Sequence, residues 1–252
     1  MGRAAGNSET REVLYGLHAV REALRAGTRP LLRLLVVRQD RQFAELVALA
    51  KAAGVPVHVE PQPVLDRLAP DHRHQGVVGL VASKSYADRD EILAFAKDSG
   101  APPFLVVLDG IEDPHNLGAI LRTAEAAGVH GVFIPERRAA GLTGTVAKVS
   151  SGALEHLRVG RATNIRRLIE ELQAEGVWVY ALDPLAPKPY TSLDLREPAA
   201  LVLGAEGKGV RPVVLEQCDD RAHIPMRGRV ASLNVSAAAA VVLYEVVRQR
   251  GG

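Results

Sequence analysis

Hydrophobic positions in the first third of the chain follow two alternating patterns. Some return every three or four residues, which predicts amphipathic helices, and others form short apolar runs, which predict strands. The predicted helices fall at residues 17–24, 43–50 and 64–68. The predicted strands fall at residues 32–37, 57–59 and 77–82. A small α/β unit is therefore expected over residues 12–83, preceded by a flexible arm over the polar residues 1–11.

The rest of the chain follows a polar connection. Residues 84–102 carry a helical patch at 92–96 and run into Pro102-Pro103, which cannot continue a helix, so a linker is expected there. Beyond it, strands are predicted at residues 104–108, 131–134, 177–181, 200–203 and 222–224. Helices are predicted at residues 117–124, 164–174 and 234–249. This alternation predicts an α/β domain over residues 103–252, with a mostly parallel sheet covered by helices on both faces.

Composition excludes several classes of protein. With 252 residues and 47% hydrophobic content, the chain can bury a sizeable core. The single Cys218 excludes an intrachain disulfide and a structural zinc site built on a cysteine pair, and it fits a reducing cytoplasm. The longest apolar run, residues 237–244, is too short to cross a bilayer. We therefore expect a cytoplasmic protein without a membrane partner or a metal.

Charge alone does not indicate a partner, because the net charge is only +2. Basic residues nevertheless concentrate in two stretches, 21–41 and 136–167. The arginines of the first stretch are Arg21, Arg25, Arg29, Arg33, Arg38 and Arg41. A solvated surface and a nucleic-acid footprint explain these stretches equally well.

Three strings of residues stand out in the second half. In the first, Asp109 to Ala124, Asp113 and Asn116 are both candidate helix caps, and Arg122 lies roughly 140° around the helix from Leu117. An ordinary capped helix with a surface arginine would give the same pattern.

The second string, LVLGAEGKGV (residues 201–210), places three glycines at the end of a predicted strand, where the backbone can approach a ligand or adopt positive φ. It matches neither the P-loop nor the Rossmann fingerprint, and a plain glycine-rich turn remains open. The third string, IPMRGRVASLNVS (residues 224–236), contains two candidate caps, Ser232 and Asn234. The helix that follows is apolar almost all round, so it is expected to be buried or to form an interface.

Taken in order, NLGAILRTAEAAG, LVLGAEGKGV and IPMRGRVASLNVSAAAAVVLYE resemble the three motifs of the SpoU family, within the SPOUT superfamily of methyltransferases. The resemblance covers about residues 103–250. In the front part, YGLHAVREAL and HRHQGV resemble the ribosomal-protein-like substrate-binding domain of SpoU enzymes that act on ribosomal RNA.

The resemblance implies a trefoil knot in the C-terminal part, a homodimer with the active site at its interface, and the cofactor S-adenosylmethionine (AdoMet). Knots are otherwise almost absent from proteins. The residues that would surround the cofactor are Gly204, Glu206, Gly207, Ile224, Pro225, Met226, Leu233 and Asn234.

The resemblance also implies a catalytic set: Arg122, Asn116, Glu206, Ser232 and Asn234. In the family, the residue matching Arg122 is proposed to act as general base. Because arginine is almost never neutral in a protein, we favour the hypothesis that Arg122 orients the ribose hydroxyl and an adjacent phosphate.

For RNA contacts, we expect phosphate-binding arginines and two histidines. The expected residues are Arg21, Arg25, Arg29, Arg33, His72 and His74. The histidine pair lacks a third ligand, so RNA contact or plain surface is favoured over a metal site.

The predicted function is AdoMet-dependent 2′-O-methylation of a ribose, that of a guanosine by the resemblance, in large-subunit (23S) ribosomal RNA or an assembling subunit. Three alternatives remain: the same reaction on transfer RNA, a non-catalytic RNA-binding or ribosome-assembly protein, and a methyltransferase that confers antibiotic resistance.

Overall fold

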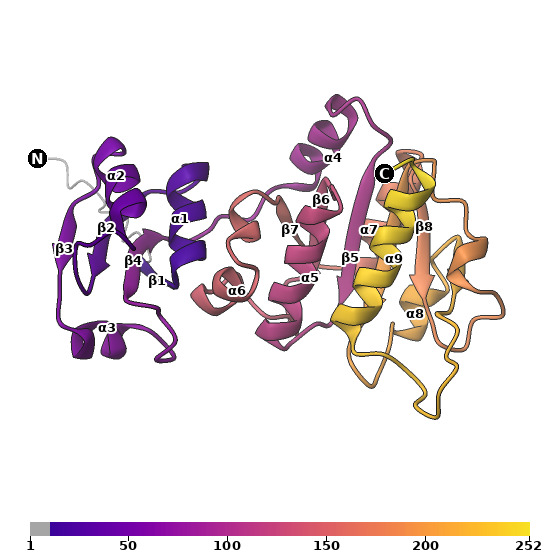
Figure 1. The fold of residues 1–252 in the computed structure, drawn as a ribbon. Helices are drawn as coiled ribbons and strands as arrows, with labels where there is room; N and C mark the ends of the chain where they lie inside the picture. Colours follow the sequence, from indigo (N-terminus) through magenta and orange to yellow (C-terminus); the bar gives the residue numbers. More distant parts are fainter. Residues whose placement is uncertain (1–10) are drawn as a thin grey trace, which may run out of the picture. The chain divides into compact units, whose positions relative to one another are not determined.

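The computed structural model describes residues 11–252, and their contacts divide them into two compact units (Figure 1). Unit 1 contains residues up to 85 together with residues 142–156, and unit 2 contains residues 86–141 and 157–252. The expected flexible arm falls almost wholly on residues 1–10, outside the described residues, whereas Arg11 begins a strand.

Unit 1 is built on a four-stranded sheet with the order β1-β4-β2-β3. Strand β4 is antiparallel to β1 and β2, and β3 is parallel to β2. The elements are β1 (Arg11–Tyr15), α1 (Leu17–Ala26), β2 (Leu31–Val36), α2 (Ala44–Ala52), β3 (Val57–Val59), α3 (Gln62–Leu68) and β4 (Val77–Ala82). The expected small α/β unit is present. Strand β1 was not predicted from the sequence, because it follows a polar segment and is held as a strand by pairing with β4.

A later part of the chain completes unit 1. Residues 142–156, expected in the C-terminal domain, form α6 (Gly144–Val149) and the 3₁₀ helix η1 (Ala153–Glu155) against β1 and α1. A Cβ atom on Gly144 would lie 1.9 Å from the Val13 carbonyl oxygen, so only glycine allows α6 to approach β1 this closely. The Tyr15 and Thr145 hydroxyls are 3.1 Å apart and share a hydrogen bond.

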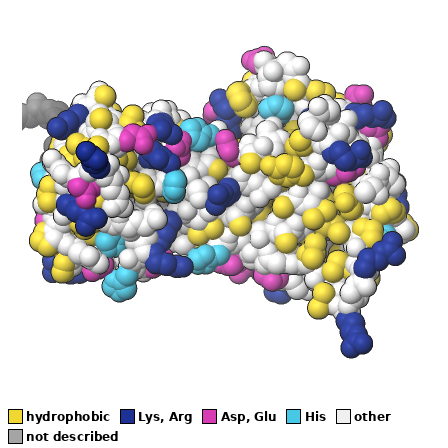
Figure 2. Space-filling view, in the orientation of Figure 1, with side chains coloured by type: hydrophobic (Ala, Val, Ile, Leu, Met, Phe, Trp, Pro, Cys, Tyr) yellow, Lys and Arg dark blue, Asp and Glu magenta, His cyan; other side chains and the backbone are white. Residues whose placement is uncertain are grey.

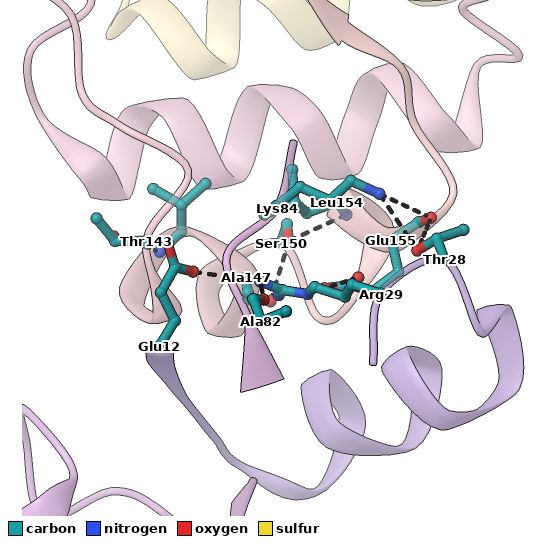
Figure 3. Close-up of polar contacts among 11 residues, drawn as sticks. Glu12, Thr28, Arg29, Ala82, Lys84, Thr143, Ala147, Ser150, Leu154 and Glu155 are labelled. Atoms are coloured by element: carbon teal, nitrogen blue, oxygen red, sulfur yellow. Dashed lines mark hydrogen bonds and ion pairs between the residues drawn. The ribbon is translucent and has the colours of Figure 1, made fainter. Parts of the chain in front are cut away.

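A buried ion pair fixes residues 142–156 to the N-terminal part of unit 1 (Figure 3). The Arg29 guanidinium donates from Nε and Nη2 to the two carboxylate oxygens of Glu155, at 3.1 and 2.6 Å. It also donates from Nη1 to Glu12 at 3.2 Å. The side chains of Arg29 and Glu155 are 3% and 0% exposed. Such a bidentate, desolvated pair is geometrically specific, so it holds η1 at one position on unit 1.

Unit 2 is built on a six-stranded, wholly parallel sheet with the order β10-β8-β9-β5-β6-β7. Its strands are β5 (Phe104–Asp109), β6 (Gly131–Pro135), β7 (Val159–Ala162), β8 (Trp178–Leu182), β9 (Ala199–Gly204) and β10 (Asp220–Ala222). Its helices are α4 (Arg89–Asp98), α5 (Pro114–Ala126), α7 (Ile165–Ala174), η2 (Tyr190–Ser192), α8 (Pro212–Leu215) and α9 (Val235–Gln249). The expected parallel α/β domain is confirmed.

Alternate side chains of the buried strands face two helical layers. Leu105 and Val107 of β5 pack in one core with apolar residues of α4, α7 and α8, while α5 and α9 pack together in the other layer. Helix α4 lies in the expected linker, yet its Ile92 is fully buried in this core. The linker prediction was therefore wrong for residues 89–98. Among the described residues, no helix is long and apolar enough to cross a membrane.

The buried ion pair gives the first testable prediction. Replacing Arg29 with Met should cost about 3–5 kcal/mol of unfolding free energy, because Glu155 is left as an unpaired buried charge. Denaturant unfolding of the whole chain measures it. Arg38→Ala, which breaks the exposed Arg38–Asp40 pair, is the control and should cost less than about 1 kcal/mol. Equal costs for the two variants would contradict the assignment.

Cys218 reports on the packing of unit 2. Burial raises the pKa of its thiol to about 12, and the nearby Asp219 and Asp109 add to the shift. Its Sγ lies 3.2 Å from the Val214 carbonyl oxygen, to which it donates. At pH 8 the native chain should therefore hold on the order of a thousandfold less thiolate than the unfolded chain. Alkylation rates by mass spectrometry, with and without denaturant, check this, and similar rates would refute it.

Candidate active site

The carboxyl ends of the central parallel strands bring the three sequence strings together. In the sheet register, Asp109 at the end of β5 stands beside Gly204 at the end of β9. Strand β8 lies on the other side of β9, and β10 lies beyond it. The loops that follow these strands therefore leave the sheet at one edge, which is where ligands bind in open α/β sheets.

The glycine string forms a tight turn after β9. Ala205 and Gly209 exchange two backbone hydrogen bonds, at 3.1 and 2.8 Å. Gly207 and Gly209 have φ values of 76° and 66°, as the sequence analysis anticipated for glycines in this string. A Cβ atom on Gly204 would lie 2.0 Å from the backbone carbon of Gly209. Glycine is therefore required at 204 for the turn to fold back on its own strand.

Asn116 connects the three strings. Its Nδ2 donates to Glu206 Oε2 at 3.1 Å, and its Oδ1 accepts from Asn234 Nδ2 at 3.0 Å. Asn234 also caps α9, because its Oδ1 accepts from the backbone nitrogen of Ser236. Of the two candidate caps of α5, Asp113 is confirmed, since it accepts from the backbone nitrogen of His115, and Asn116 does not cap the helix. Asn116 lies within the first turn of α5 and is 8% exposed. The two ends of its side-chain amide bond to Glu206 and Asn234, respectively.

A second contact, which the sequence analysis missed, holds the glycine turn to β5. The buried Asp109 carboxylate accepts from the Arg211 backbone nitrogen at 2.9 Å and from its guanidinium at 2.7 and 2.8 Å. The two residues are far apart in the sequence and belong to no shared pattern. Only the adjacency of β5 and β9 brings them together.

These loops line a cavity whose wall holds both apolar and polar residues. Its lining includes most of the residues expected around the cofactor: Gly204, Glu206, Gly207, Ile224, Met226 and Leu233, with Ser232 beside them. Pro225 and Asn234 do not line it, although Asn234 bonds to Asn116. The cavity also takes residues that the sequence analysis did not single out, among them Leu182, Asp183 and Pro184 after β8. The position of β8 beside β9, which no local pattern encodes, places them there.

The Arg122 side chain does not contribute to the cavity of its own chain. It is exposed on α5, does not line the cavity, and its side chain makes no hydrogen bond or ion pair with any residue from 11 to 252. The structure thus joins Asn116, Glu206 and Asn234, but it does not add Arg122 to them. The role of Arg122 stays a prediction.

The residues expected to contact RNA in unit 1 fall into two groups. His72, at 84% side-chain exposure, lines a surface hollow together with His18, Arg73 and Lys148. Arg33 is exposed and has no hydrogen bond or ion pair through its side chain with residues 11–252. The exposed Arg25 pairs with Glu22 and Glu45. Arg21 also pairs with these two glutamates.

For two residues the expectation was wrong. The Arg29 guanidinium is buried in its ion pair with Glu155, so it is not exposed to RNA phosphates. His74 is 2% exposed, with Nε2 against Asp66 at 2.9 Å and Nδ1 accepting from the Gly76 backbone nitrogen. The His74 contact, with His72 beside it, holds the pKa of Asp66 below its usual value. In the described residues, no cluster of three or more potential metal ligands occurs.

Comparison with known families gives two matches. Residues 103–244 match the SpoU rRNA Methylase family, and residues 13–87 match the RNA 2′-O ribose methyltransferase substrate-binding domain. The first match contains the whole cavity, and the second falls in unit 1 apart from residues 86 and 87.

Individual proteins agree. YacO of Bacillus subtilis strain 168, named as a TrmH family tRNA/rRNA methyltransferase, is 43% identical over 96% of this chain and 98% of its own. The crystal structure of an AdoMet-bound rRNA methyltransferase from Sinorhizobium meliloti matches 94% of this chain and 87% of its own, with 27% identity and a TM-score of 0.78. That of the A. aeolicus TrmH/SpoU tRNA-modifying enzyme matches 64% of this chain and 83% of its own, with 28% identity and a TM-score of 0.55.

The Asn116–Asn234 bond can be separated from the cap of α9. Asn234→Ser keeps a good capping side chain but removes the amide that donates to Asn116, whereas Asn234→Ala removes both. We expect the serine variant to lose about 1–3 kcal/mol of unfolding free energy, because the buried Asn116 Oδ1 is left unpaired. The alanine variant should lose about 1 kcal/mol more. Denaturant unfolding measures both, and a serine variant as stable as the parent chain would show that the bond contributes nothing.

Proposed function

Because the chain belongs to the SpoU rRNA methylase family, we propose that it transfers a methyl group from AdoMet to a ribose 2′-hydroxyl of large-subunit ribosomal RNA. The observation that carries this proposal is the convergence of the three strings on one cavity through Asn116. An accidental resemblance of separate strings would not require them to meet in space.

The cavity fits AdoMet in its chemistry. Ile224, Met226 and Leu233 offer an apolar surface for a purine ring, and the glycine turn exposes backbone groups that can bind the polar atoms of the nucleoside. Bound AdoMet would supply an electrophilic sulfonium methyl group. The remaining expected residue, Pro225, would shape the backbone between Ile224 and Met226 rather than line the cavity.

In this proposal, the expected catalytic residues have separate roles. Because arginine is almost never neutral in a protein, Arg122 orients the ribose hydroxyl and an adjacent phosphate, and this phosphate assists removal of the hydroxyl proton. Asn116 and Asn234 hold the Glu206 carboxylate at the cavity wall, at 3.1 and 3.5 Å, and Ser232 lies beside it in the lining. Alignment of the two reactants is a large part of such a displacement reaction, and this fixed wall provides it.

Two observations favour ribosomal RNA over transfer RNA. The rRNA methyltransferase of S. meliloti matches nearly the whole chain, whereas the tRNA-modifying enzyme of A. aeolicus matches 64% of it. Unit 1 also matches a substrate-binding domain, and its surface carries the exposed His72 and Arg33. These residues, with Arg21 and Arg25, are proposed to bind RNA phosphates.

The outer face of α9 supports a homodimer. Val242, Leu243 and Val246 are buried, while Tyr244 is 50% exposed. Ala237 and Tyr244, two turns apart, both lie on the exposed side, and Figure 2 shows hydrophobic side chains gathered over the face that carries α5 and α9. We propose that this face pairs with a second copy, which would bring Arg122 of one chain to the cavity of the other. A trefoil knot in the C-terminal part of the chain and a cytoplasmic location complete the proposal.

Methyl transfer from labelled AdoMet to unmodified transcripts tests the function. We expect a labelled 2′-O-methylnucleoside in large-subunit ribosomal RNA and none in transfer RNA, with loss of the label in Arg122→Lys. Label in transfer RNA alone would overturn the choice of substrate. Absence of label in either RNA and in ribosomal precursor particles would support a non-catalytic RNA-binding protein, and drug sensitivity of a deletion strain tests a role in resistance.

A further inference from the structure

The basic side chains of unit 2 divide into two sets by their partners. One set forms ion pairs, hydrogen bonds or both with the unit itself. This set comprises Arg89, Lys97, Arg158, Arg161, Arg166, Arg167, Lys188, Arg196, Arg211, Arg221, Arg248 and Arg250. Most of its charges are neutralised by a carboxylate, while Arg250 binds backbone carbonyls and Arg161 binds the Tyr86 hydroxyl, so the set adds little to the field outside the molecule.

The other set has no hydrogen bond or ion pair through its side chains among residues 11–252. Apart from Arg122, its members are Arg137, Arg138, Lys208, Arg227 and Arg229, all exposed, and we call them the rim cations. Lys208 stands between Gly207 and Gly209, which both line the cavity. Arg227 and Arg229 fall between the lining residues Met226 and Ala231.

Arg137 and Arg138 reach the same edge from β6. A Cβ atom placed on Gly110 would lie 3.9 Å from the Arg138 carbonyl oxygen. The same Cβ position is 3.7 Å from the Ala205 Cβ. Ala205 lines the cavity. The backbone of Ala140 also bonds to Ile111, which fixes this loop beside the end of β5. Loops after β9 and β10 therefore carry unpaired cations at the cavity, and the loop after β6 carries two more beside them.

The acidic groups at this edge compensate these charges only in part. Asp109 is paired with Arg211 and Asp183 with Arg221, whereas Glu206 accepts from two neutral asparagine amides and keeps its charge. The exposed Glu112, Asp113 and Glu136, on the loops after β5 and β6, form no ion pair among residues 11–252. Figure 1 shows the loop between β10 and α9 projecting below α9, and in Figure 2 Lys and Arg side chains project from the lower edge of unit 2. The loops after β9 and β10 thus present three cations without an ion pair at the rim of the cavity: Lys208, Arg227 and Arg229.

We propose that the rim cations bind the sugar-phosphate backbone of the RNA on both sides of the target nucleotide. This inference rests on the proposed function and adds the residues that hold the substrate at the cavity. Long cationic side chains without partners remain hydrated in the free protein and can exchange that hydration for phosphates, with release of counterions from the RNA. Their position at the cavity edge allows them to place the ribose without reading its base.

The double variant Arg227→Ala/Arg229→Ala tests the proposal. With an unmodified large-subunit RNA transcript, we expect KM for RNA to rise tenfold or more while the affinity for AdoMet, measured by calorimetry, stays within twofold. The slope of log Kd for RNA against log salt concentration should become shallower by about 1.5, since each phosphate contact contributes about 0.7–0.9. A merely structural role would not change that slope.

Arg166→Ala/Arg167→Ala is the matched control, because both arginines are exposed on α7 but pair with Glu170 and Glu171. It should leave RNA affinity and the salt slope unchanged. Arg137→Ala/Arg138→Ala, on another loop, should repeat the effect of the first variant. If the parent chain methylates RNA and both rim variants match it in affinity and slope, the inference is overturned and the proposed function stands. If the parent chain neither binds nor methylates RNA, both are overturned.

Discussion

The side-chain amide of Asn116 is the interaction on which the candidate site depends. It uses one end to hold Glu206 of the glycine turn and the other to hold Asn234, the cap of α9. Because the amide is buried, each bond that it loses leaves a desolvated polar atom. Three loops that diverge from a parallel sheet are thereby fixed in one arrangement. A pocket for a flexible cofactor requires such preorganisation, since a loop ordered only on binding would reduce affinity.

Unit 1 also depends on a contact between segments that are far apart in the sequence. Residues 142–156 belong by sequence to the methylase family region, yet they pack with the N-terminal sheet and are fixed by the Arg29–Glu155 pair. The order of the chain therefore does not match the order of its cores. A protein cut at residue 103 would separate Glu155 from Arg29 and leave β1 without its α6 neighbour.

Sequence patterns predicted what local forces determine. The helix over 117–124, the strand over 200–203 and the positive φ of Gly207 all follow from periodicity or from glycine's freedom. Sequence patterns failed where contacts between distant segments determine the local structure. Strand β1 exists only through β4, and Asp183 reaches the cavity because β8 stands beside β9. Charge counting failed for Arg29 because burial depends on a partner 126 positions away.

The central claim is that the glycine turn after β9 builds the wall of an AdoMet site. Calorimetric titration of AdoMet into the parent chain and into Gly204→Ala tests it most directly. A methyl group at this position would overlap the backbone of Gly209 and Val210, so the turn must move. The account predicts clear binding to the parent chain and at least tenfold weaker binding to the variant, with Gly228→Ala, where a Cβ atom meets nothing within 4 Å, as the control. Equal affinity of Gly204→Ala and the parent chain would contradict it.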